Sequence, residues 1–376
     1  MTRVIIVQRI LSKYRVPFFE ELRRCLIKDN IKFEFIHGIG NAEDQKRGYV
    51  GSLPWAKVIS ERYFSFGKTG FVFQPYGKYL KDADLVIVQQ EMRWLLNYWL
   101  LLSPNRPFKL AFWGHGYNHQ APLNSFDNKI KKVFLKKVDW WFAYTQGVAG
   151  WIKAQGFSPE QVSVVQNSID TRKMQSIMDG VSSAEIAAFR KRNNIDGAAK
   201  VGLFCSGMYP EKRLDFLLEA CREVKNKIPS FHMIFIGAGP QEGIAKRACA
   251  QTPWMHYLGP QYEREKILAF LASDIMLMPG LVGLNILDCF VAGIPLITTA
   301  YPYHSPEIEY LVSGVNGAIT ENDLSAYTDA VAGLLENTGK LDLLKRGCAV
   351  SAQQYSMENM VANFHKGIQD CLDFQG

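Results

Sequence analysis

The 376-residue sequence has no apolar run long enough to span a membrane. Its longest apolar stretch, residues 94–102, is interrupted by Asn97 and followed by Ser103 and Pro104, whereas a bilayer span needs roughly 20 residues. We interpret this stretch as a buried helix. The first ten residues, MTRVIIVQRI, lack the longer apolar core and the small-residue cleavage site of a signal peptide. These absences predict a cytoplasmic protein.

Cysteine patterns and disordered segments are absent as well. The seven cysteines follow no metal-binding spacing, and several lie in apolar segments where a reduced cysteine acts as a small hydrophobe. We therefore expect neither disulfides nor a metal site. With 48% hydrophobic and 21% charged residues, the composition is that of a globular protein that folds over nearly its whole length.

Short β-rich runs alternate with helical patterns, which predicts an α/β protein. Continuous apolar strands alternating with helices indicate parallel sheets covered on both faces, and the length fits two such domains. The expected strands are residues 4–8, 32–37, 85–89, 109–113 and 140–144 in the first half and 201–205, 233–236, 275–278 and 296–298 in the second.

A connector separates the two halves near Asn167, in the segment VVQNSID. We place the first domain at residues 1–166 and the second at residues 167–355. After the glycine-rich segment 314–317 the pattern is helical to the end of the chain, which is more helix than one flanked sheet needs. We therefore expect the last helix, within residues 356–376, to cap or bridge another part of the protein.

The segment LFCSGMYPEKRLDFLLEA (203–220) is predicted to form a strand, a loop and an amphipathic helix, with Lys212 and Arg213 at the start of the helix. Free backbone N–H groups and the positive end of the helix dipole favour a phosphate there, and basic side chains add charge-assisted hydrogen bonds. The alternative is a pair of solvated surface charges. Because basic residues in a first helical turn oppose the dipole, we favour an anion site.

Two further glycine-containing loops follow predicted strands. In FIGAGP (235–240), Gly237 and Gly239 permit a close backbone approach, either to a ligand or only within a tight strand-to-helix turn. In segment 279–299 a glycine-rich loop opens a helix whose only acid, Asp288, is surrounded by apolar residues. A buried carboxylate needs hydrogen bonds, which ligand hydroxyls would supply; an exposed position at the helix edge is the alternative.

Together these loops resemble the donor half of the retaining GT-B glycosyltransferases, specifically family 4 (glycosyltransferase group 1), which builds bacterial polysaccharides and glycolipids. The resemblance spans residues 139–370 and includes the PEK, GAGP and YLGPQYEREKILAFLASDIMLMPG segments. It implies two doubly wound Rossmann-like domains facing a central cleft, the first binding the acceptor and the second the donor. It also implies a C-terminal helix that packs back on the first domain.

The resemblance assigns donor-binding roles to residues of the second half. Lys212 would bind the donor diphosphate and Arg213 would add positive charge. Asp288 would accept a hydrogen bond from the ribose. The remaining donor-binding positions are main-chain groups of the glycine loops, at Gly237, Gly239, Gly283, Leu284 and Asn285. The donor is a nucleoside diphosphate sugar, and no cofactor or metal is implied.

Two positions depart from the family pattern. The first glutamate of the family's E-x7-E motif, which contacts the transferred sugar, falls at Gly280. The arginine that usually precedes the lysine falls near Gly207. Arg213 could replace the lost positive charge, but no residue of the sequence obviously replaces the glutamate.

In the first half, FWGHGYN (112–118) places His115 between two glycines directly after a predicted strand. It matches the N-domain histidine of the family, which positions the donor sugar and stabilises developing charge. We predict His115 as the catalytic residue, and a purely structural histidine in a glycine turn is the alternative. Tyr117, Asn118 and His119 are looser candidates.

The loop after the first strand, QRILSKYRVPFF (8–19), contains Pro17, a residue that favours helix starts. We expect Tyr14 and Arg15 to project toward the cleft and assign them to the acceptor. An Asp-x-Asp pair, Asp82 and Asp84, could bind a metal and a nucleotide in the other glycosyltransferase fold. Because it precedes a strand instead of following one, we interpret it as a helix end.

The net charge of +7 arises in the first half, because residues 1–165 contain 24 basic and 13 acidic side chains. Within it, segment 126–142 has Ile130, Val133 and Phe134 on one helical face and lysines around the other. Such a basic helix can contact an anionic bilayer, at the inner face of the cell membrane. A core-packed helix with a solvated lysine face is the alternative, and we expect no nucleic acid partner.

The sequence thus predicts a retaining hexosyltransferase, independent of metal, that acts on a glycan or lipid-linked acceptor in surface polysaccharide or glycolipid synthesis. Two alternatives stay open. One is a nucleotide-sugar epimerase or hydrolase on the same fold, although few carboxylates surround the expected sugar position. The other is a non-catalytic subunit that binds a nucleotide sugar or glycan, suggested by Gly280 and Gly207.

Overall fold

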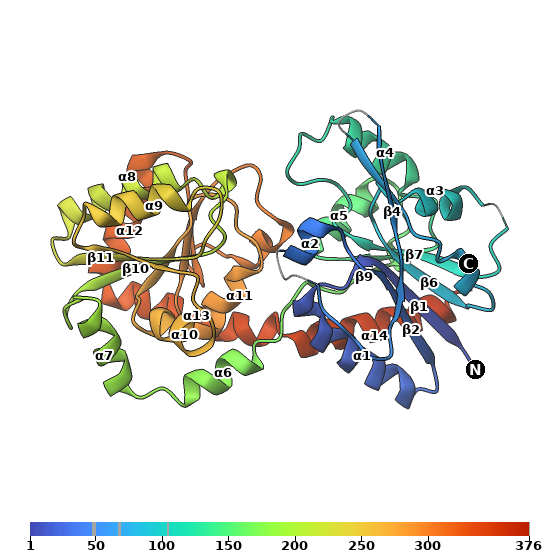
Figure 1. Ribbon diagram of the computed structural model, residues 1–376, viewed down its shortest axis with the longest axis horizontal. Coiled ribbons are helices and arrows are strands. Elements are labelled where there is room, and N and C mark those ends of the chain that lie inside the picture. Colours follow the sequence, from blue (N-terminus) through green and yellow to red (C-terminus); the bar gives the residue numbers. More distant parts are fainter. Residues whose placement is uncertain (47–49, 67–68, 104, 376) are drawn as a thin grey trace. The chain divides into compact units, whose positions relative to one another are not determined.

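The computed structural model describes residues 1–46, 50–66, 69–103 and 105–375. The chain divides into two compact units. The first comprises Met1–Asp170 and Met357–Gly376, and the second comprises Thr171–Ser356. The chain therefore leaves the first unit a few residues after the boundary expected from the sequence (Figure 1).

A parallel sheet forms the centre of the first unit, with its strands in the order β3-β2-β1-β6-β7-β8-β9. A separate antiparallel hairpin of β4 and β5 accompanies it. The strands are β1 (Arg3–Ile10), β2 (Lys32–Gly38), β3 (Lys57–Ile59), β4 (Arg62–Phe66), β5 (Thr69–Phe73), β6 (Leu85–Gln89), β7 (Lys109–Gly114), β8 (Trp140–Ala143) and β9 (Val162–Val164).

Helices cover both faces of this sheet because alternate strand residues point to opposite sides. In β1, Val4 and Ile6 pack with α1 and α14, whereas Ile5 and Val7 pack with α3 and α5. The helices of the unit are α1 (Val16–Lys28), α2 (Ala42–Lys46), α3 (Leu95–Leu102), α4 (Phe126–Phe134), α5 (Gln146–Ala154) and α14 (Met357–Asp373), with 3-10 turns η1 (Lys13–Arg15), η2 (Gly77–Tyr79) and η3 (Pro159–Gln161).

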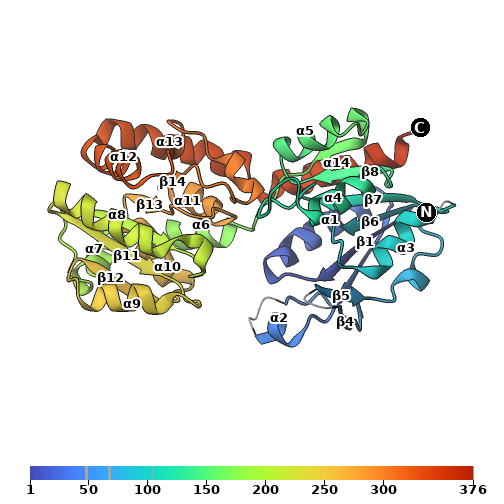
Figure 2. The ribbon, with the colours of Figure 1, turned by 90° about the horizontal axis from the view of Figure 1, so that it is seen from above.

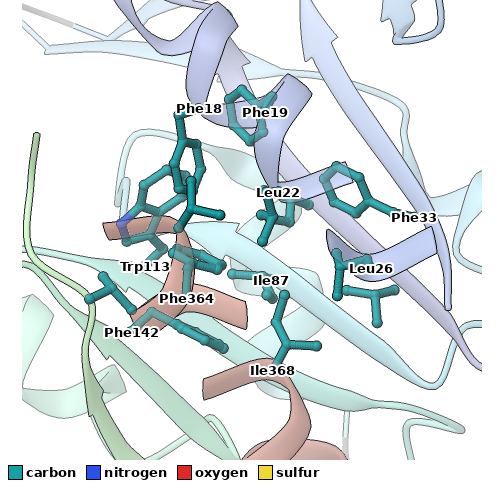
Figure 3. Packing of buried hydrophobic residues seen from close by; sticks show 14 of the residues in the cluster. Phe18, Phe19, Leu22, Leu26, Phe33, Ile87, Trp113, Phe142, Phe364 and Ile368 are labelled. Atoms are coloured by element: carbon teal, nitrogen blue, oxygen red, sulfur yellow. The ribbon is translucent and has the colours of Figure 1, made fainter. Parts of the chain in front are cut away.

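The last helix, α14, belongs to the first unit although it follows the second in sequence. Figure 3 shows Phe364 and Ile368 among side chains of α1 and of the sheet. Phe364 stacks on Phe142 with ring centroids 4.6 Å apart and meets Trp113 edge-on at 4.9 Å. The predicted return of the C-terminal helix to the first unit is confirmed.

The second unit has a parallel sheet in the order β12-β11-β10-β13-β14-β15. Helix α8 packs with α12, and α11 packs with α13 (Figure 2). The strands are β10 (Lys200–Cys205), β11 (Phe231–Ile236), β12 (Met255–Gly259), β13 (Ile275–Leu277), β14 (Leu296–Thr299) and β15 (Gly317–Thr320). The helices are α6 (Arg172–Asp179), α7 (Ser183–Arg192), α8 (Leu214–Lys227), α9 (Glu242–Ala250), α10 (Glu263–Leu271), α11 (Asn285–Ala292), α12 (Leu324–Glu336) and α13 (Thr338–Gln354), with 3-10 turns η4 (Pro210–Lys212) and η5 (Pro306–Tyr310).

Three expectations about elements need correction. The chain is not purely helical after residue 317, because β15 adds a short edge strand there. Helix α3 forms, but only one of its faces is buried, and the buried face includes Asn97. Asn97 is fully enclosed because it accepts a hydrogen bond of 2.7 Å from the Tyr76 hydroxyl and donates to the carbonyl oxygens of Gln89 and Glu91.

The Asp82–Asp84 segment forms a turn directly before β6 instead of a helix end. Asp84 Oδ2 accepts a hydrogen bond of 2.7 Å from the backbone N–H of Arg3. This contact lies at the amino ends of β1 and β6, whereas ligands of such sheets bind at the carboxyl ends. Asp84 therefore has a structural role that joins two strands.

Candidate functional site

Each sheet changes its winding direction at one point, and ligands of open α/β sheets bind outside the carboxyl ends of the strands at such a point. In the second unit the chain runs outward from β10 to β12 and then continues at β13, on the other side of β10. The loops that border this point are therefore residues 206–213, after β10, and residues 278–284, after β13. In the first unit the corresponding strands are β1 and β6.

Lys212 links the two loops of the second unit. Its side chain is buried, and Nζ donates a hydrogen bond of 2.5 Å to the carbonyl oxygen of Leu281. The backbone N–H of Leu281 donates in return to the carbonyl oxygen of Glu211, at 2.9 Å. Burial lowers the pKa of Lys212 to about 8. The ammonium group is therefore protonated at neutral pH but poorly solvated, which favours the approach of an anion.

Arg213 begins α8 in the left-handed backbone region, with φ of 57°. Its Nη1 donates to three protein acceptors, the Pro279 carbonyl oxygen at 3.2 Å, Thr299 Oγ1 at 3.2 Å and Asn322 Oδ1 at 2.5 Å. Arg213 therefore ties the start of α8 to the loop after β13, to the end of β14 and to the loop after β15. Its role toward a diphosphate stays a prediction, which Nε and Nη2 would have to fulfil.

Gly280, the position of the family's first glutamate, has no room for a side chain. A Cβ atom built there would overlap the carbonyl oxygen of Glu211 and the backbone of Lys212. The same approach of the two loops allows the hydrogen bond between Leu281 and Glu211. The structure thus gives a steric reason for glycine at this position.

Gly237 and Gly239 bring a third loop against residues 206–208. Their φ angles are 135° and 154°, and Cβ atoms there would overlap the backbone of Ser206 and Met208. Met208 donates its N–H to the Ala238 carbonyl oxygen at 2.9 Å. The need for glycine is therefore explained by loop packing, and a contact with a ligand stays a prediction.

The N-terminal end of α11 presents free backbone donors beside Lys212. In the described parts of the chain, the N–H groups of Leu284 and Asn285 have no acceptor. Asn285 Oδ1 accepts from the N–H of Gly283 at 3.2 Å. Asn285 Nδ2 lies 3.0 Å from the sulfur of Met278, which is also 3.8 Å from Lys212 Nζ. The structure therefore brings the predicted glycine loop and Lys212 together.

His304, which the sequence reasoning missed, holds the same loop in place. Its Nδ1 accepts a hydrogen bond of 3.0 Å from the N–H of Val282, and its Nε2 lies 2.9 Å from the carbonyl oxygen of Thr299. Burial lowers the pKa of His304, so that the neutral imidazole with its proton on Nε2 satisfies both contacts. No motif marks this residue, because its partners are 22 and 5 positions away.

Asp288 has a partner within the protein. Its Oδ2 lies 2.7 Å from Nζ of Lys266 in α10, and the two side chains are 16% and 28% exposed. Burial alone would lower the pKa of Lys266, but the neighbouring Asp288 outweighs burial and raises it. The expectation that only a ligand or solvent would satisfy Asp288 is therefore wrong. Lys266 supplies one hydrogen bond, while Oδ1 has no partner among the described residues.

In the first unit, His115 lies directly after β7 and packs against Tyr144, with ring centroids 4.2 Å apart. Its Nδ1 is enclosed and has no hydrogen-bond partner within the described chain. Burial, followed by the neighbouring His119, Lys131 and Arg15, lowers the pKa of His115 to about 3. His115 is therefore neutral at pH 7, able to exchange hydrogen bonds but not to carry charge.

The three looser candidates form an aromatic and polar cluster next to His115. Tyr117 stacks on His119 at 3.9 Å and meets Trp151 at 5.0 Å. Burial lowers the pKa of His119 to about 4. Asn118 instead donates its backbone N–H to Asn128 Oδ1 at 2.6 Å, which fixes the loop to α4.

The side chain of Arg15 is enclosed within the first unit instead of projecting toward a cleft as expected. Its side chain is only 2% exposed, and Nη2 donates to Asn167 Oδ1 at 2.6 Å and to the Tyr144 hydroxyl at 3.3 Å. The guanidinium group also lies over the Trp113 ring, 4.7 Å from its centroid. Tyr14 is exposed, and its contact with an acceptor stays a prediction.

Helices α3 and α4 carry an apolar and basic surface. The helices meet where Tyr98 contacts Phe134 edge-on at 5.2 Å. Val133, which the sequence pattern places on the packed face, is exposed instead, whereas Ile130 and Phe134 pack against the core. We define the α3–α4 surface by its exposed apolar residues Leu95, Trp99, Leu102, Leu123, Phe126 and Val133 and its exposed lysines Lys129, Lys132, Lys136 and Lys137.

The described residues contain no group of three or more histidine, cysteine, aspartate or glutamate side chains that could hold a metal ion. None of the described helices is both long enough and apolar enough to cross a bilayer.

The chain is similar to one protein family over part of its length and to several solved structures over nearly all of it. Residues 199–337 match the family model described as glycosyl transferases group 1. No curated protein sequence matches the chain. Among solved structures, Alr3699/HepE of Anabaena, crystallised with UDP, is 14% identical with a TM-score of 0.70, covering 98% of this chain and 100% of its own.

Two other solved structures cover the chain to the same extent. A glycosyltransferase from Rickettsia africae ESF-5 is 15% identical with a TM-score of 0.69 and covers 100% of this chain and 99% of its own. Sucrose-phosphate synthase from Thermosynechococcus elongatus is 11% identical with a TM-score of 0.69 and covers 98% of each chain. Residues 199–337 of the second unit thus match the glycosyl transferases group 1 family, and the whole chain has the GT-B fold.

Proposed function

We propose that the protein is a retaining glycosyltransferase that needs no metal ion and moves a hexosyl group from a nucleoside diphosphate sugar to a glycan or lipid-linked acceptor. Synthesis of a surface polysaccharide or glycolipid is the process this activity serves. The observation that carries the proposal is the convergence of Lys212 and the N-terminal end of α11 at the switch point of the second sheet.

The leaving diphosphate is the group that this convergence suits. As the glycosidic bond breaks, negative charge builds on the diphosphate oxygens. Lys212 supplies an ammonium group that burial leaves poorly solvated, and Leu284 and Asn285 supply free backbone donors. Such preorganised donors stabilise charge as it develops, without the reorganisation that water would need.

The transferred sugar develops positive charge of oxocarbenium type in the same step. His115 is neutral at pH 7 because burial lowers its pKa to about 3. A neutral imidazole can exchange a hydrogen bond with a sugar hydroxyl without repelling this positive charge. Main-chain groups and Asn285 take over part of the positioning, since Gly280 has no room for the family's glutamate.

A uridine nucleotide is the first donor type to test. Alr3699/HepE was crystallised with UDP and with UDP-glucose, and its fold covers this chain nearly completely. In the proposed site, Asp288 Oδ1 accepts a hydrogen bond from the ribose.

Replacement of Lys212 tests the proposal. We expect Lys212→Ala to lower the transfer rate by about two orders of magnitude or more, because the leaving group loses its charged partner. Turnover of a panel of nucleoside diphosphate sugars with cell-derived glycolipids is the measurement. Lys227→Ala, which removes an exposed lysine paired with Asp329 on the same unit, is the control. Unchanged turnover in Lys212→Ala would refute the assignment.

A non-catalytic subunit that binds a nucleotide sugar is the second candidate, and the absent side chain at Gly280 favours it. The same panel distinguishes the two functions. Donor binding without turnover of any sugar would identify a binding subunit, and turnover to free sugar alone would identify a hydrolase.

The α3–α4 surface is proposed to contact an anionic membrane, where a lipid-linked acceptor would be presented. On α3, Leu95, Trp99 and Leu102 are spaced as one helical stripe, and Trp99 and Leu102 are 54% and 63% exposed. The four lysines beside them give the charge that anionic headgroups attract, at about 1 kcal/mol for each residue near the membrane surface.

Sedimentation with vesicles tests this contact. The wild type should bind phosphatidylglycerol vesicles at low salt. It should not bind phosphatidylcholine vesicles, and high salt should abolish its binding to phosphatidylglycerol vesicles. The double variant W99S/L102S should bind about tenfold more weakly, whereas L343S/V350S, which alters two exposed residues of α13, should bind like the wild type. Equal binding by both double variants would argue against the α3–α4 surface.

A further inference from the structure

The ion pair of Lys266 and Asp288 differs in burial from the other ion pairs described in the second unit. Asp288 is 16% exposed and Lys266 28%, whereas every side chain in the other pairs of that unit is at least 35% exposed. A partly buried ion pair loses much of its attraction to desolvation. Stability alone is therefore a weak reason for this pair.

The pair lies at the switch point of the second sheet. Asp288 is in the first turn of α11, three residues after Asn285, so both side chains lie on the same side of the helix. Lys266 comes from α10, which packs against α11. The partly buried thiol of Cys205, the last residue of β10, lies within electrostatic reach of both charges. The pair therefore borders the loop that begins after β10 and carries Lys212.

The contact leaves one carboxylate oxygen of Asp288 available. Lys266 Nζ bonds Oδ2, whereas Oδ1 accepts no hydrogen bond from the described residues. A carboxylate is an acceptor only, so its ligand must present a hydroxyl or N–H donor. A phosphate would be repelled there, but a ribose hydroxyl would be bound.

We propose that Lys266 is a positioning residue for nucleotide recognition, which holds the Asp288 carboxylate in one rotamer so that Oδ1 faces a ribose hydroxyl. The inference rests on the proposed function and adds the residue on which ribose recognition depends. Without Lys266, the carboxylate would be free to rotate, and its partly buried charge would lack a counter-ion.

The test compares ribose with deoxyribose ligands. Calorimetric titration with the diphosphates of uridine, guanosine, adenosine and cytidine identifies the tightest ligand for the wild type, and its 2′-deoxy and 3′-deoxy forms are then titrated. A hydrogen bond to a charged acceptor corresponds to roughly tenfold or more in affinity. We expect one deoxy form to bind the wild type at least about tenfold more weakly than the ribose form.

In Lys266→Met this discrimination should fall to about twofold, because the ribose form binds more weakly while the deoxy form is little affected. Lys266→Arg should retain most of the discrimination, and Asp288→Asn should lose it. Lys227→Met is the matched control, because it removes an exposed ion pair of the same unit. A purely structural ion pair would change the melting temperature of Lys266→Met without changing the ratio of the two affinities.

The outcomes separate this inference from the proposed function. If the wild type binds no nucleoside diphosphate, the proposed function and the inference both fail. If the wild type discriminates between the sugars and folded Lys266→Met does so equally, only the inference is overturned. Should Lys266→Met not fold, full discrimination by Asp288→Asn would overturn it.

Discussion

Single residues in the second unit are fixed by the close approach of loops. Gly280 packs directly against the backbone of Glu211 and Lys212, which occupies the space that a Cβ of residue 280 would need. The same contact buries Lys212 and directs its ammonium group to Leu281. The loss of the family's glutamate and the burial of the lysine thus have one geometric cause.

A methyl group at Gly280 should destabilise the second unit. We expect Gly280→Ala to lower the free energy of unfolding by about 1–3 kcal/mol, as overpacking of a close contact does. Urea unfolding followed by circular dichroism is the measurement. Gly333→Ala in α12 is the control, because a Cβ there meets nothing within 4 Å and alanine favours a helix over glycine by about 0.5–1 kcal/mol. Equal stability of both variants would contradict the contact.

Lys212 should make nucleotide binding depend on pH. Its pKa of about 8 in the free protein should rise when a diphosphate binds, so binding takes up a proton in this range. Affinity should therefore be constant below pH 7 and fall as the pH rises through 8. Calorimetric titration of UDP between pH 6 and 9.5 is the measurement. Lys212→Arg should remove the decline, because arginine keeps its charge throughout.

At the scale of elements, neighbouring strands place polar groups together that lie far apart in sequence. His232 of β11 and His256 of the edge strand β12 stack in parallel, with Nδ1 of the first 2.9 Å from Nε2 of the second. Burial lowers the pKa of both, that of His256 to about 4 with a further contribution from His232. Both imidazoles are therefore neutral at pH 7.

This histidine pair should weaken the second unit in acid. Because the folded pKa of His256 lies below the unfolded value of about 6.5, the unfolded chain binds more protons at low pH. The contribution of the neutral histidine to the free energy of unfolding is complete above pH 6.5 and is lost as the pH falls toward 4. The loss is at most about 2 kcal/mol after allowance for solvent screening. Urea unfolding at pH 7 and pH 4.5 is the measurement. His256→Phe should lose less stability between these pH values than the wild type, and an equal loss would refute this role.

At the scale of the whole molecule, each unit has its own sheet, but the first unit takes its last helix from the end of the chain. Phe364 of α14 contacts Phe18, Trp113 and Phe142 of the first unit. The core of the first unit is therefore completed only by the last residues of the chain.

Removal of residues 357–376 should destabilise the first unit selectively. Seven of the eight tryptophans lie in the first unit and only Trp254 in the second, so tryptophan fluorescence reports the first. In urea, the fluorescence transition of the truncated chain should move to lower concentration, because a buried aromatic and aliphatic face of the sheet loses its cover. Circular dichroism should retain a later transition from the second unit.

Trp254→Phe in the full-length chain is the control, since it should leave the fluorescence transition in place. If truncation left the fluorescence transition unchanged, α14 would not be part of the core of the first unit.

Local patterns of the sequence were sufficient to predict most of the central strands and the loops that carry the candidate site. Apolar runs such as residues 85–89 match β6 completely, because strand periodicity and burial are local properties of a chain. Lys212 and the loop before α11 were identified for the same reason, since a strand followed by a glycine loop and a helix is a local pattern. The short strands β12 and β15 were not predicted, because the apolar pattern of each is only a few residues long.

Which side chains meet depends on how distant segments pack, and the sequence pattern did not predict it. Arg15 is enclosed by Tyr144 and Asn167, and Asp288 is paired with Lys266, because helices and strands distant in sequence pack there. Trp99 and Val133 are exposed for a similar reason, since no element among the described residues covers these side chains of α3 and α4. The partners of a side chain depend on which distant segments pack against it, and the spacing of neighbouring residues in the sequence does not reveal these segments.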